Sequence, residues 1–288
     1  GVLDVTPRVC IRAWDAALEA QDAFFRAQEE AGRKVLADLA ASGRKGIVII
    51  GRPYNTQDAM VSSGIPAKIS EHGFTVIPMD MLPFEPERLG PALDNMYWNY
   101  GQKILSAVRQ VADNPNLYGV YLTSFNCGPD SFLLDMAETM MADKPFLVLE
   151  LDEHGSDGGY LTRVEAFLDV LRAHGRNASH AVRMLEPPTG TREAMKGRIL
   201  WIPRMHPVAS RLIAAVFRGH GFESQCVPES DEEAHSLGKN ACRGSECTPM
   251  ALTLGTFLKT VRDSGLPSSR HAFFMPTATG PCRFGCYA

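Results

Sequence analysis

Residues 46–51, GIVIIG, point to the fold of this chain, because they form a short, continuous apolar run after a polar segment. Such a run, without alternation of polar and apolar residues, is typical of a parallel strand buried on both faces. Glycine, arginine and proline follow at once in GRPYNTQD (51–58), which predicts a turn at the carboxyl end of the strand. The stretch therefore predicts the first strand of an α/β sheet.

Patterns typical of helices and strands occur on both sides of this predicted strand. Upstream, apolar residues at the helical period predict one long helix over residues 7–42. Downstream, strands are expected at 74–79, 117–123, 145–151, 198–203, 222–228 and 271–276. Helical patterns separate them at 62–72, 96–112, 130–142, 162–174, 207–217 and 250–261. This alternation predicts βαβ units with parallel sheets.

A polar segment with two prolines and two glycines, residues 186–198, reads as a linker. We therefore expect an N-terminal helical segment (1–44), a first α/β domain (45–190) and a second α/β domain (191–288). The second domain repeats the rhythm of the first but stops early, so it is expected to be incomplete. The chain starts at Gly1 without a methionine and stops after a cysteine motif, which suggests a piece of a longer protein.

Composition excludes several classes of function. The 288 residues carry a formal charge of -4, which argues against nucleic acid as a main partner, since phosphate binding needs clustered basic residues. No apolar run approaches the ~20 residues of a membrane span and no signal peptide opens the chain, so a cytoplasmic protein is expected. In a reducing compartment, 7 cysteines gathered in motifs indicate a metal site or catalytic thiols rather than disulfides.

The cysteines lie in loops that follow strands or precede helices. They are Cys127 in SFNCGPD (124–130), Cys242 and Cys247 in NACRGSECTPM (240–250), and Cys282 and Cys286 in MPTATGPCRFGCYA (275–288). In open parallel sheets, ligands bind beyond the carboxyl ends of the strands. An iron–sulfur cubane needs thiolates that converge from several directions, which such loops can supply. The nearby glycines would let backbone amides approach sulfide; they are Gly128, Gly244, Gly280 and Gly285.

Other interpretations stay open at this point. Cys242 and Cys247 could bind a structural zinc, although their C-x4-C spacing is less typical, or could be inert thiols. Cys10 and Cys226 are expected in the core. The loop with Arg52, Tyr54 and Asn55 is either a turn or a ligand loop in which the guanidinium binds a phosphate or carboxylate. The chain has no P-loop, Rossmann fingerprint or nucleophile elbow, so ATP hydrolysis by this piece alone is not expected.

Five motifs together resemble one family. They are GRPYNTQD (51–58), SFNCGPDS (124–131), ELDEHGSDGGYLTRVEAFLD (150–169), CRGSECTPM (242–250) and FFMPTATGPCRFG (273–285). The family is the large activator proteins of 2-hydroxyacyl-CoA dehydratases, also called acyl-CoA dehydratase activase-related or CoA-substrate-specific enzyme activase proteins. The resemblance runs from about Ile47 to Tyr287.

The resemblance implies two flavodoxin-like domains with an iron–sulfur cluster between them. Its implied ligands for a [4Fe-4S] cluster are Cys127, Cys242 and/or Cys247, and Cys282. Cys286 stands where the family motif has glutamine, which leaves the number of ligands open. Relatives with a double-cubane cluster leave the number of cubanes open too. ATP would act only through a separate actin-like ATPase domain of the same full-length protein.

Three functions follow as expectations. The first is an iron–sulfur module for ATP-driven, low-potential electron transfer to a dehydratase or another reductase acceptor. The second is a catalytic dehydratase-like subunit in which an open cluster iron binds an acyl-CoA; three ligating cysteines would favour it. The third is an interaction domain with a structural zinc or no metal. A homodimer is compatible with each of the three.

Overall fold

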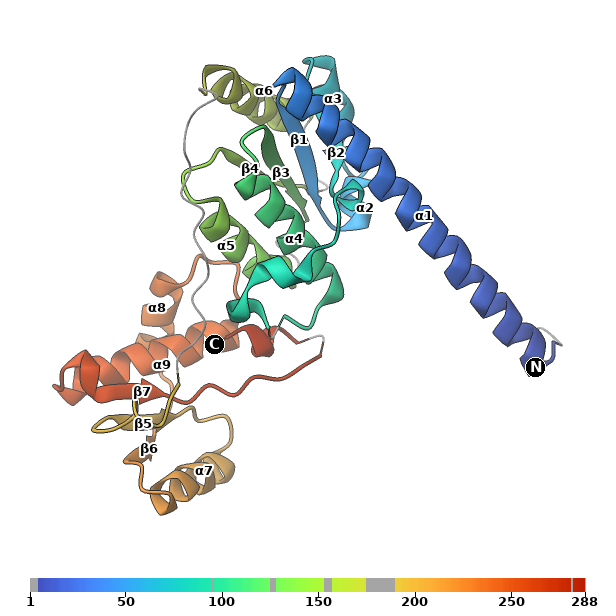
Figure 1. The fold of residues 1–288 in the computed structure, drawn as a ribbon. Coiled ribbons are helices and arrows are strands. Elements are labelled where there is room, and N and C mark those ends of the chain that lie inside the picture. The colour runs from blue at the N-terminus through green and yellow to red at the C-terminus, as the bar shows by residue number, and fades with distance from the viewer. Residues whose placement is uncertain are drawn as a thin grey trace. The chain divides into compact units, whose positions relative to one another are not determined.

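The computed structural model describes residues 5–94, 96–124, 128–152, 157–174, 190–280 and 282–287 (Figure 1). The chain divides into two compact units. The first unit takes Gly1–Leu89, Tyr100–Cys127 and Met136–Met184, and the second takes Gly90–Asn99, Gly128–Asp135 and Leu185–Ala288. Short pieces of the first half thus belong to the second unit. The domain boundaries expected at residues 44 and 190 stay predictions.

The first unit contains a parallel sheet in the order β2-β1-β3-β4. Its strands are β1 (Gly46–Gly51), β2 (Thr75–Pro78), β3 (Leu117–Thr123) and β4 (Phe146–Glu150). GIVIIG is β1, and all six of its residues are buried. It lies centrally because it pairs with β2 on one side and with β3 on the other. This strand order is that of flavodoxin-like sheets, so the prediction of an α/β fold with parallel sheets is confirmed.

Helices cover the sheet of the first unit. The elements are α2 (Pro53–Thr56), α3 (Ile65–Glu71), η1 (Met79–Met81), η2 (Pro86–Leu89), α4 (Asn99–Asp113), α5 (Asp130–Met141) and α6 (Asp157–Ala173). One core cluster joins Ile47 and Ile49 of β1 to Ile65 and Ile69 of α3 and to the apolar side of α6. Since successive strand residues point to opposite faces, Val48 and Ile50 point to the other face, where both are fully buried.

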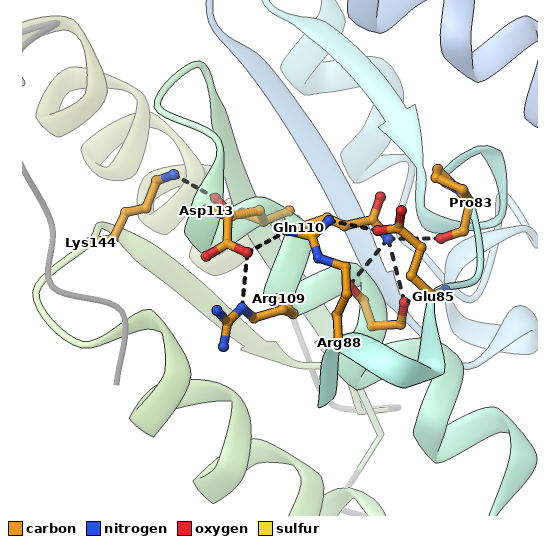
Figure 2. A network of polar contacts seen from close by, with 9 residues as sticks. Pro83, Glu85, Arg88, Arg109, Gln110, Asp113 and Lys144 are labelled. Atoms are coloured by element: carbon orange, nitrogen blue, oxygen red, sulfur yellow. Dashed lines mark hydrogen bonds and ion pairs between the residues drawn. The ribbon is translucent and has the colours of Figure 1, made fainter. Parts of the chain in front are cut away.

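A polar network ties η2 to α4 in the first unit (Figure 2). The Arg88 guanidinium lies 2.6 Å from the Glu85 carboxylate and 2.7 Å from that of Asp113. Asp113 also accepts a hydrogen bond from Nε of Arg109 at 2.9 Å. Gln110 Nε2 donates to the carbonyl oxygen of Pro83 at 2.7 Å. These contacts hold the segment between β2 and α4 in place.

The long N-terminal helix α1 (Pro7–Ser42) ends at Gly43, whose φ of 62° is the left-handed conformation of a helix C-cap. Its last part packs closely on the first unit. A Cβ on Gly32 would lie 1.8 Å from the carbonyl oxygen of Met81, so only glycine fits there. Upstream of residue 28 every described residue is exposed. The prediction that Cys10 lies in the core is therefore wrong, because its side chain is exposed on α1.

The second unit repeats the arrangement on a smaller scale. Its parallel sheet has the order β6-β5-β7, with β5 (Ile199–Ile202), β6 (Ser224–Cys226) and β7 (His271–Phe273). The helices are α7 (Pro207–Gly219), α8 (Glu232–Ala241) and α9 (Thr248–Ser264), with short turns η3 (Pro91–Leu93), η4 (Ser268–Arg270) and η5 (Arg283–Cys286). Ile199 and Trp201 pack with Phe257 of α9, whereas Leu200 and Ile202 pack with Ala214 of α7. Cys226 packs against this second cluster, partly buried.

The structure adds a helix that the sequence patterns missed. The side chain of Asp231 caps α8 by accepting a hydrogen bond from the amide of Ala234 at 2.8 Å. Two glycines let α8 and α9 pack closely, since a Cβ on Gly238 or Gly255 would lie 1.8 Å from a backbone oxygen of the other helix. The predicted strand over 271–276 ends at Phe273. In the described part of the chain, no helix combines the length and the hydropathy of a membrane span.

Candidate functional site

The cysteines of the second unit lie at the ends of short elements. Cys242 ends α8 as its C-cap, and Cys247 is the N-cap of α9. Cys282 is the N-cap of η5, and Cys286 is the last residue of that turn. Cys127 lies outside the described residues. Two of the loops predicted to carry the chemistry, 240–250 and 275–288, therefore lie in the second unit, with their cysteines beside helix ends.

Two tyrosines bring these cysteines together. The Tyr287 hydroxyl lies 2.6 Å from Sγ of Cys247, which joins the 240–250 loop to the C-terminal loop. The Tyr97 hydroxyl donates to the carbonyl oxygen of Cys282 at 2.5 Å and also hydrogen-bonds the side chain of Cys286. Three of the five predicted metal ligands, Cys247, Cys282 and Cys286, therefore contact one of two phenols within the second unit.

Aromatic and basic side chains also contact the two loops that carry these cysteines. The indole of Trp98 donates to the carbonyl oxygen of Gly280 at 3.0 Å. The ring of Phe132 stacks on Tyr287, with centroids 6.1 Å apart and an interplanar angle of 17°. Arg283 donates to the Ser131 hydroxyl at 3.0 Å and to the carbonyl oxygen of Ser245 at 3.4 Å. Segments around residues 97, 131, 245 and 283, far apart in sequence, therefore meet at the cysteine loops.

Burial raises the pKa of several groups here. It raises the pKa of the Cys242 thiol, and the nearby Glu246 and Cys247 add to the effect. It also raises the pKa of Cys286, although the hydrogen bond between Cys286 and Tyr97 opposes this. The pKa of Tyr287 is raised first by burial and then by its hydrogen bond with Cys247. These thiols are neutral near pH 7 unless a bound cation favours the thiolate.

Glu246 organises the CRGSEC loop. Its carboxylate accepts hydrogen bonds from the amides of Arg243 at 3.1 Å and Gly244 at 3.0 Å. Burial on its own would raise the pKa of Glu246, but the backbone donors outweigh it and lower the pKa. The Gly244 amide, expected at a sulfide, thus binds a carboxylate here. Sequence reasoning missed Glu246 as the residue that fixes the spacing of Cys242 and Cys247.

A cavity of about 520 Å³ opens beside Cys282 in the second unit. It lies at the carboxyl ends of β5, β6 and β7, where parallel sheets bind ligands. Most of its wall is apolar. Its lining includes Arg204, Val227, Met275, Cys282, Phe284 and Tyr287. Arg204, the basic group of this wall, is paired with Glu229 at 2.6 Å.

In the first unit the predicted ligand loop follows β1. Asn55 is fully buried, accepts a hydrogen bond from the Ser124 hydroxyl at 2.7 Å and donates to the carbonyl oxygen of Leu122 at 3.5 Å. Its side chain thus joins the ends of β1 and β3. Tyr54 is half exposed, and Arg52 lies just before α2. The role of these three residues as a ligand loop stays a prediction.

Beside this loop lies a polar cluster that sequence reasoning missed. Asp80 accepts a hydrogen bond from the Tyr100 hydroxyl at 3.1 Å and one from Gln57 at 2.8 Å. Burial raises the pKa of Tyr100, and Asp80 adds to the effect, whereas Arg52 opposes it. The carboxylate and the phenol therefore satisfy each other at the carboxyl end of β2.

The cysteines of the second unit do not form a complete set of metal ligands in the described part of the chain. Among the described residues, no group of three or more His, Cys, Asp or Glu side chains is placed to hold a metal ion. The donor set is nevertheless of the kind that iron–sulfur clusters use, because the gathered groups are thiols rather than imidazoles or carboxylates. The type of side chain therefore fits such a cluster. In the described residues, however, fewer than three of these thiols are close enough together to bind one metal ion.

Comparisons with known proteins identify one part of the chain. Residues 1–82 match the family described as the CoA enzyme activase uncharacterised domain. Neither the curated proteins nor the solved structures contain a match. The matched range comprises α1, the strands β1 and β2 and the GRPYN loop, and it ends before the cysteine loops. This match over residues 1–82 is consistent with the resemblance to acyl-CoA dehydratase activase-related proteins.

Proposed function

We propose that the chain holds a [4Fe-4S] cluster through the cysteines of its second unit and serves ATP-driven electron transfer linked to 2-hydroxyacyl-CoA dehydratase chemistry. One observation carries the proposal. Cys247, Cys282 and Cys286 contact Tyr97 or Tyr287 within one unit, and Cys242 is close enough to Cys247 for the two thiols to interact. Cys127 is proposed as a further ligand from the loop that precedes α5.

The residues of the chain would prepare the site in three ways. Glu246 holds the 242–247 loop at a fixed spacing, and Tyr97 and Trp98 hold the C-terminal loop by its backbone. The rings of Phe132 and Phe284 both contact that of Tyr287, and together they would limit access of water to a cluster. When bound, such a cluster supplies one-electron chemistry at a low potential, which burial and nearby amides tune. The thiols would lose their protons on ligation, so binding would be coupled to pH.

The proposed partners follow from the family description. ATP would be hydrolysed by an actin-like ATPase domain of the same full-length protein, since this chain lacks a P-loop. The electron would pass to a dehydratase or another reductase acceptor. No nucleic acid or membrane is proposed as a partner, and the cytoplasm is the proposed location.

The cavity beside Cys282 favours a second candidate function. Its volume of about 520 Å³ is within the range of small-molecule sites, and its wall is largely apolar. A catalytic dehydratase-like subunit would place an acyl group there, next to a cluster with one iron free of cysteine. A third candidate, a zinc-stabilised or metal-free interaction domain, requires no such cavity.

The deciding experiment is anaerobic reconstitution of the whole chain, followed by iron, sulfide and zinc analysis and by EPR after reduction with dithionite. The proposal expects about four irons and as many sulfides per chain, with the signal of a reduced cubane. Zinc in place of iron, or no metal, would support the third candidate and end the redox proposal. A change of the EPR signal on addition of an acyl-CoA would favour the catalytic subunit over the electron carrier.

A further inference from the structure

The N-terminal part of α1 is a helix whose described residues are exposed to solvent. Residues 5–27 are all exposed, and near their end the Phe25 ring lies under the ammonium of Lys103, 4.8 Å from its centroid. Over about 20 residues a helix is about 30 Å long. Trp14 is 66% exposed, Ile11 62% and Phe24 56%. Isolated helices are marginal in water, and large apolar side chains in contiguous patches mark interaction surfaces. This segment therefore requires a partner.

The exposed apolar residues continue the stripe by which α1 packs on its own unit. Gly32 and Leu39 are the buried residues of the helix, seven positions apart. The same interval of seven leads upstream to Phe25, Leu18 and Ile11, with Trp14 three positions after Ile11. A repeat of seven is the signature of helices that pair side by side. We call Ile11, Trp14, Leu18 and Phe25 the exposed stripe.

The charges next to the exposed stripe show which partner fits it. Arg8 and Arg12 lie near the start of the helix, and Asp15, Glu19 and Asp22 follow within four turns. On a helical projection at 100° per residue, these five lie on one edge of the stripe. Parallel pairing of two copies would place this charged edge beside the other edge of the second helix, which carries Cys10, Ala17 and Phe24, so the charges would gain no partner. Antiparallel pairing instead opposes the basic end of each helix to the acidic middle of the other.

We propose that the exposed stripe binds the exposed stripe of a second copy of this chain in an antiparallel, two-fold symmetric pair. In the register that suits the charges best, Trp14 of each copy packs on Leu18 of the other, and Arg8 of each faces Asp22 of the other. Asp15 then faces Asp15 at the two-fold axis, so two opposite-charge contacts stand against one like-charge contact. The same surface is used by both copies, as a two-fold interface demands. The pairing goes beyond the proposed redox function and does not depend on a bound cluster.

A small cavity supports this register. A hollow of about 180 Å³ lies beside Phe25 in the first unit and is also lined by Glu29, Phe84 and Lys103. Phe84 is 38% exposed, so the apolar surface continues from the helix into the unit. With Trp14 on Leu18, the start of the second helix, at Val5 and Pro7, arrives opposite Phe25. The other copy thus brings an apolar end to the hollow.

The first test is sedimentation equilibrium of the whole chain over a range of concentrations. We expect a monomer–dimer equilibrium that Trp14→Ala weakens by about tenfold or more, as for a large aromatic at an interface centre. Val9→Ala is the matched control, since Val9 is also exposed on α1 but points away from the stripe. A chain that stays monomeric, or a dimer that Trp14→Ala leaves unchanged, overturns the proposal, the second outcome by placing the contact elsewhere.

A charge exchange tests the antiparallel direction. Arg8→Asp and Asp22→Arg each place like charges opposite one another, so each variant is expected to weaken dimerisation. The double variant restores opposite charges only in the antiparallel pair and should recover the wild-type dissociation constant. Failure of the double variant to recover dimerisation would overturn the proposed register. Circular dichroism of each variant verifies that α1 remains helical, which its exposure leads us to expect.

Discussion

In both sheets the strands are parallel and their carboxyl ends lie at one edge, but the residues that follow these ends differ between the two units. After β1 and β3 of the first unit, the polar side chains bind their own chain: Asn55 is fully buried and contacts both strand ends. After β5, β6 and β7 of the second unit lie a cavity of about 520 Å³ and loops with thiols. Each unit thus has a loop region at the carboxyl ends of its strands. The residues in those loops decide whether the region links the strand ends by hydrogen bonds or forms a cavity that can bind a ligand.

The largest effect should come from the cysteines of the second edge. We expect Cys282→Ala, Cys127→Ala and Cys247→Ala each to remove most of the iron from the reconstituted chain, because each deletes a thiolate ligand. Cys10→Ala is the matched control, since Cys10 is exposed on α1. Iron content and the EPR signal are the readouts. Equal iron in all four variants would contradict the ligand assignment.

The next effect concerns stability in the first unit and should leave iron unchanged. Lys144 is 3% exposed, and its ammonium donates to the carbonyl oxygens of Val111 and Asn114, each at 2.5 Å. Burial lowers the pKa of Lys144 to about 8, although Asp113 opposes the shift. In the unfolded chain the pKa keeps its ordinary value of 10.5.

The sign follows from proton binding. Between pH 8 and 10.5 the unfolded chain binds more protons at Lys144 than the folded chain, so this group makes the folded state more stable as pH rises. The gain is up to about 3 kcal/mol over that window. Urea unfolding at several pH values measures it. Lys144→Met should abolish this part of the pH dependence, and an identical pH profile in the variant would show that Lys144 does not cause it.

A smaller effect is expected where hydrogen bonds link the strand ends of the first unit. Asn55→Ala leaves the Leu122 carbonyl and the Ser124 hydroxyl without their partner and should reduce the free energy of unfolding by about 1–3 kcal/mol. Gln57→Ala, at an exposed hydrogen bond nearby, is the control and should cost less. Iron content should match the wild type in both. Loss of iron in Asn55→Ala would mean that the two edges are coupled.

The smallest effect is expected from the indole that holds the C-terminal loop. Trp98→Phe removes the hydrogen bond to the Gly280 carbonyl but keeps an aromatic ring, at a cost of about 1 kcal/mol. We expect slower reconstitution or faster loss of iron to a chelator, with the final iron content nearly unchanged. Chelation kinetics measure this. If the Trp98→Phe variant loses iron at the wild-type rate, the hydrogen bond from Trp98 to the Gly280 carbonyl contributes to the stability of the fold but not to retention of the cluster.

Local patterns in the sequence determined α1, the buried strand GIVIIG, the βαβ alternation and the presence of cysteines in loops next to helix ends. These features depend on residue periodicity, glycine and proline, which act over a few neighbouring residues. The same patterns missed α8, because its stability comes from the glycine contacts of Gly238 and Gly255 between two helices. They also placed Cys10 in a core, since amphipathicity cannot say whether a helix face has a partner.

Only the tertiary structure decided which residues meet. The bond from Tyr97 to the backbone of Cys282 joins positions 185 residues apart, and that from Tyr287 to Cys247 joins positions 40 apart. Whether the Gly244 amide is available to a ligand depends on Glu246, whose carboxylate already accepts it. Such contacts depend on how packed elements place distant segments. A sequence pattern, which reports on neighbours along the chain, carries no record of them.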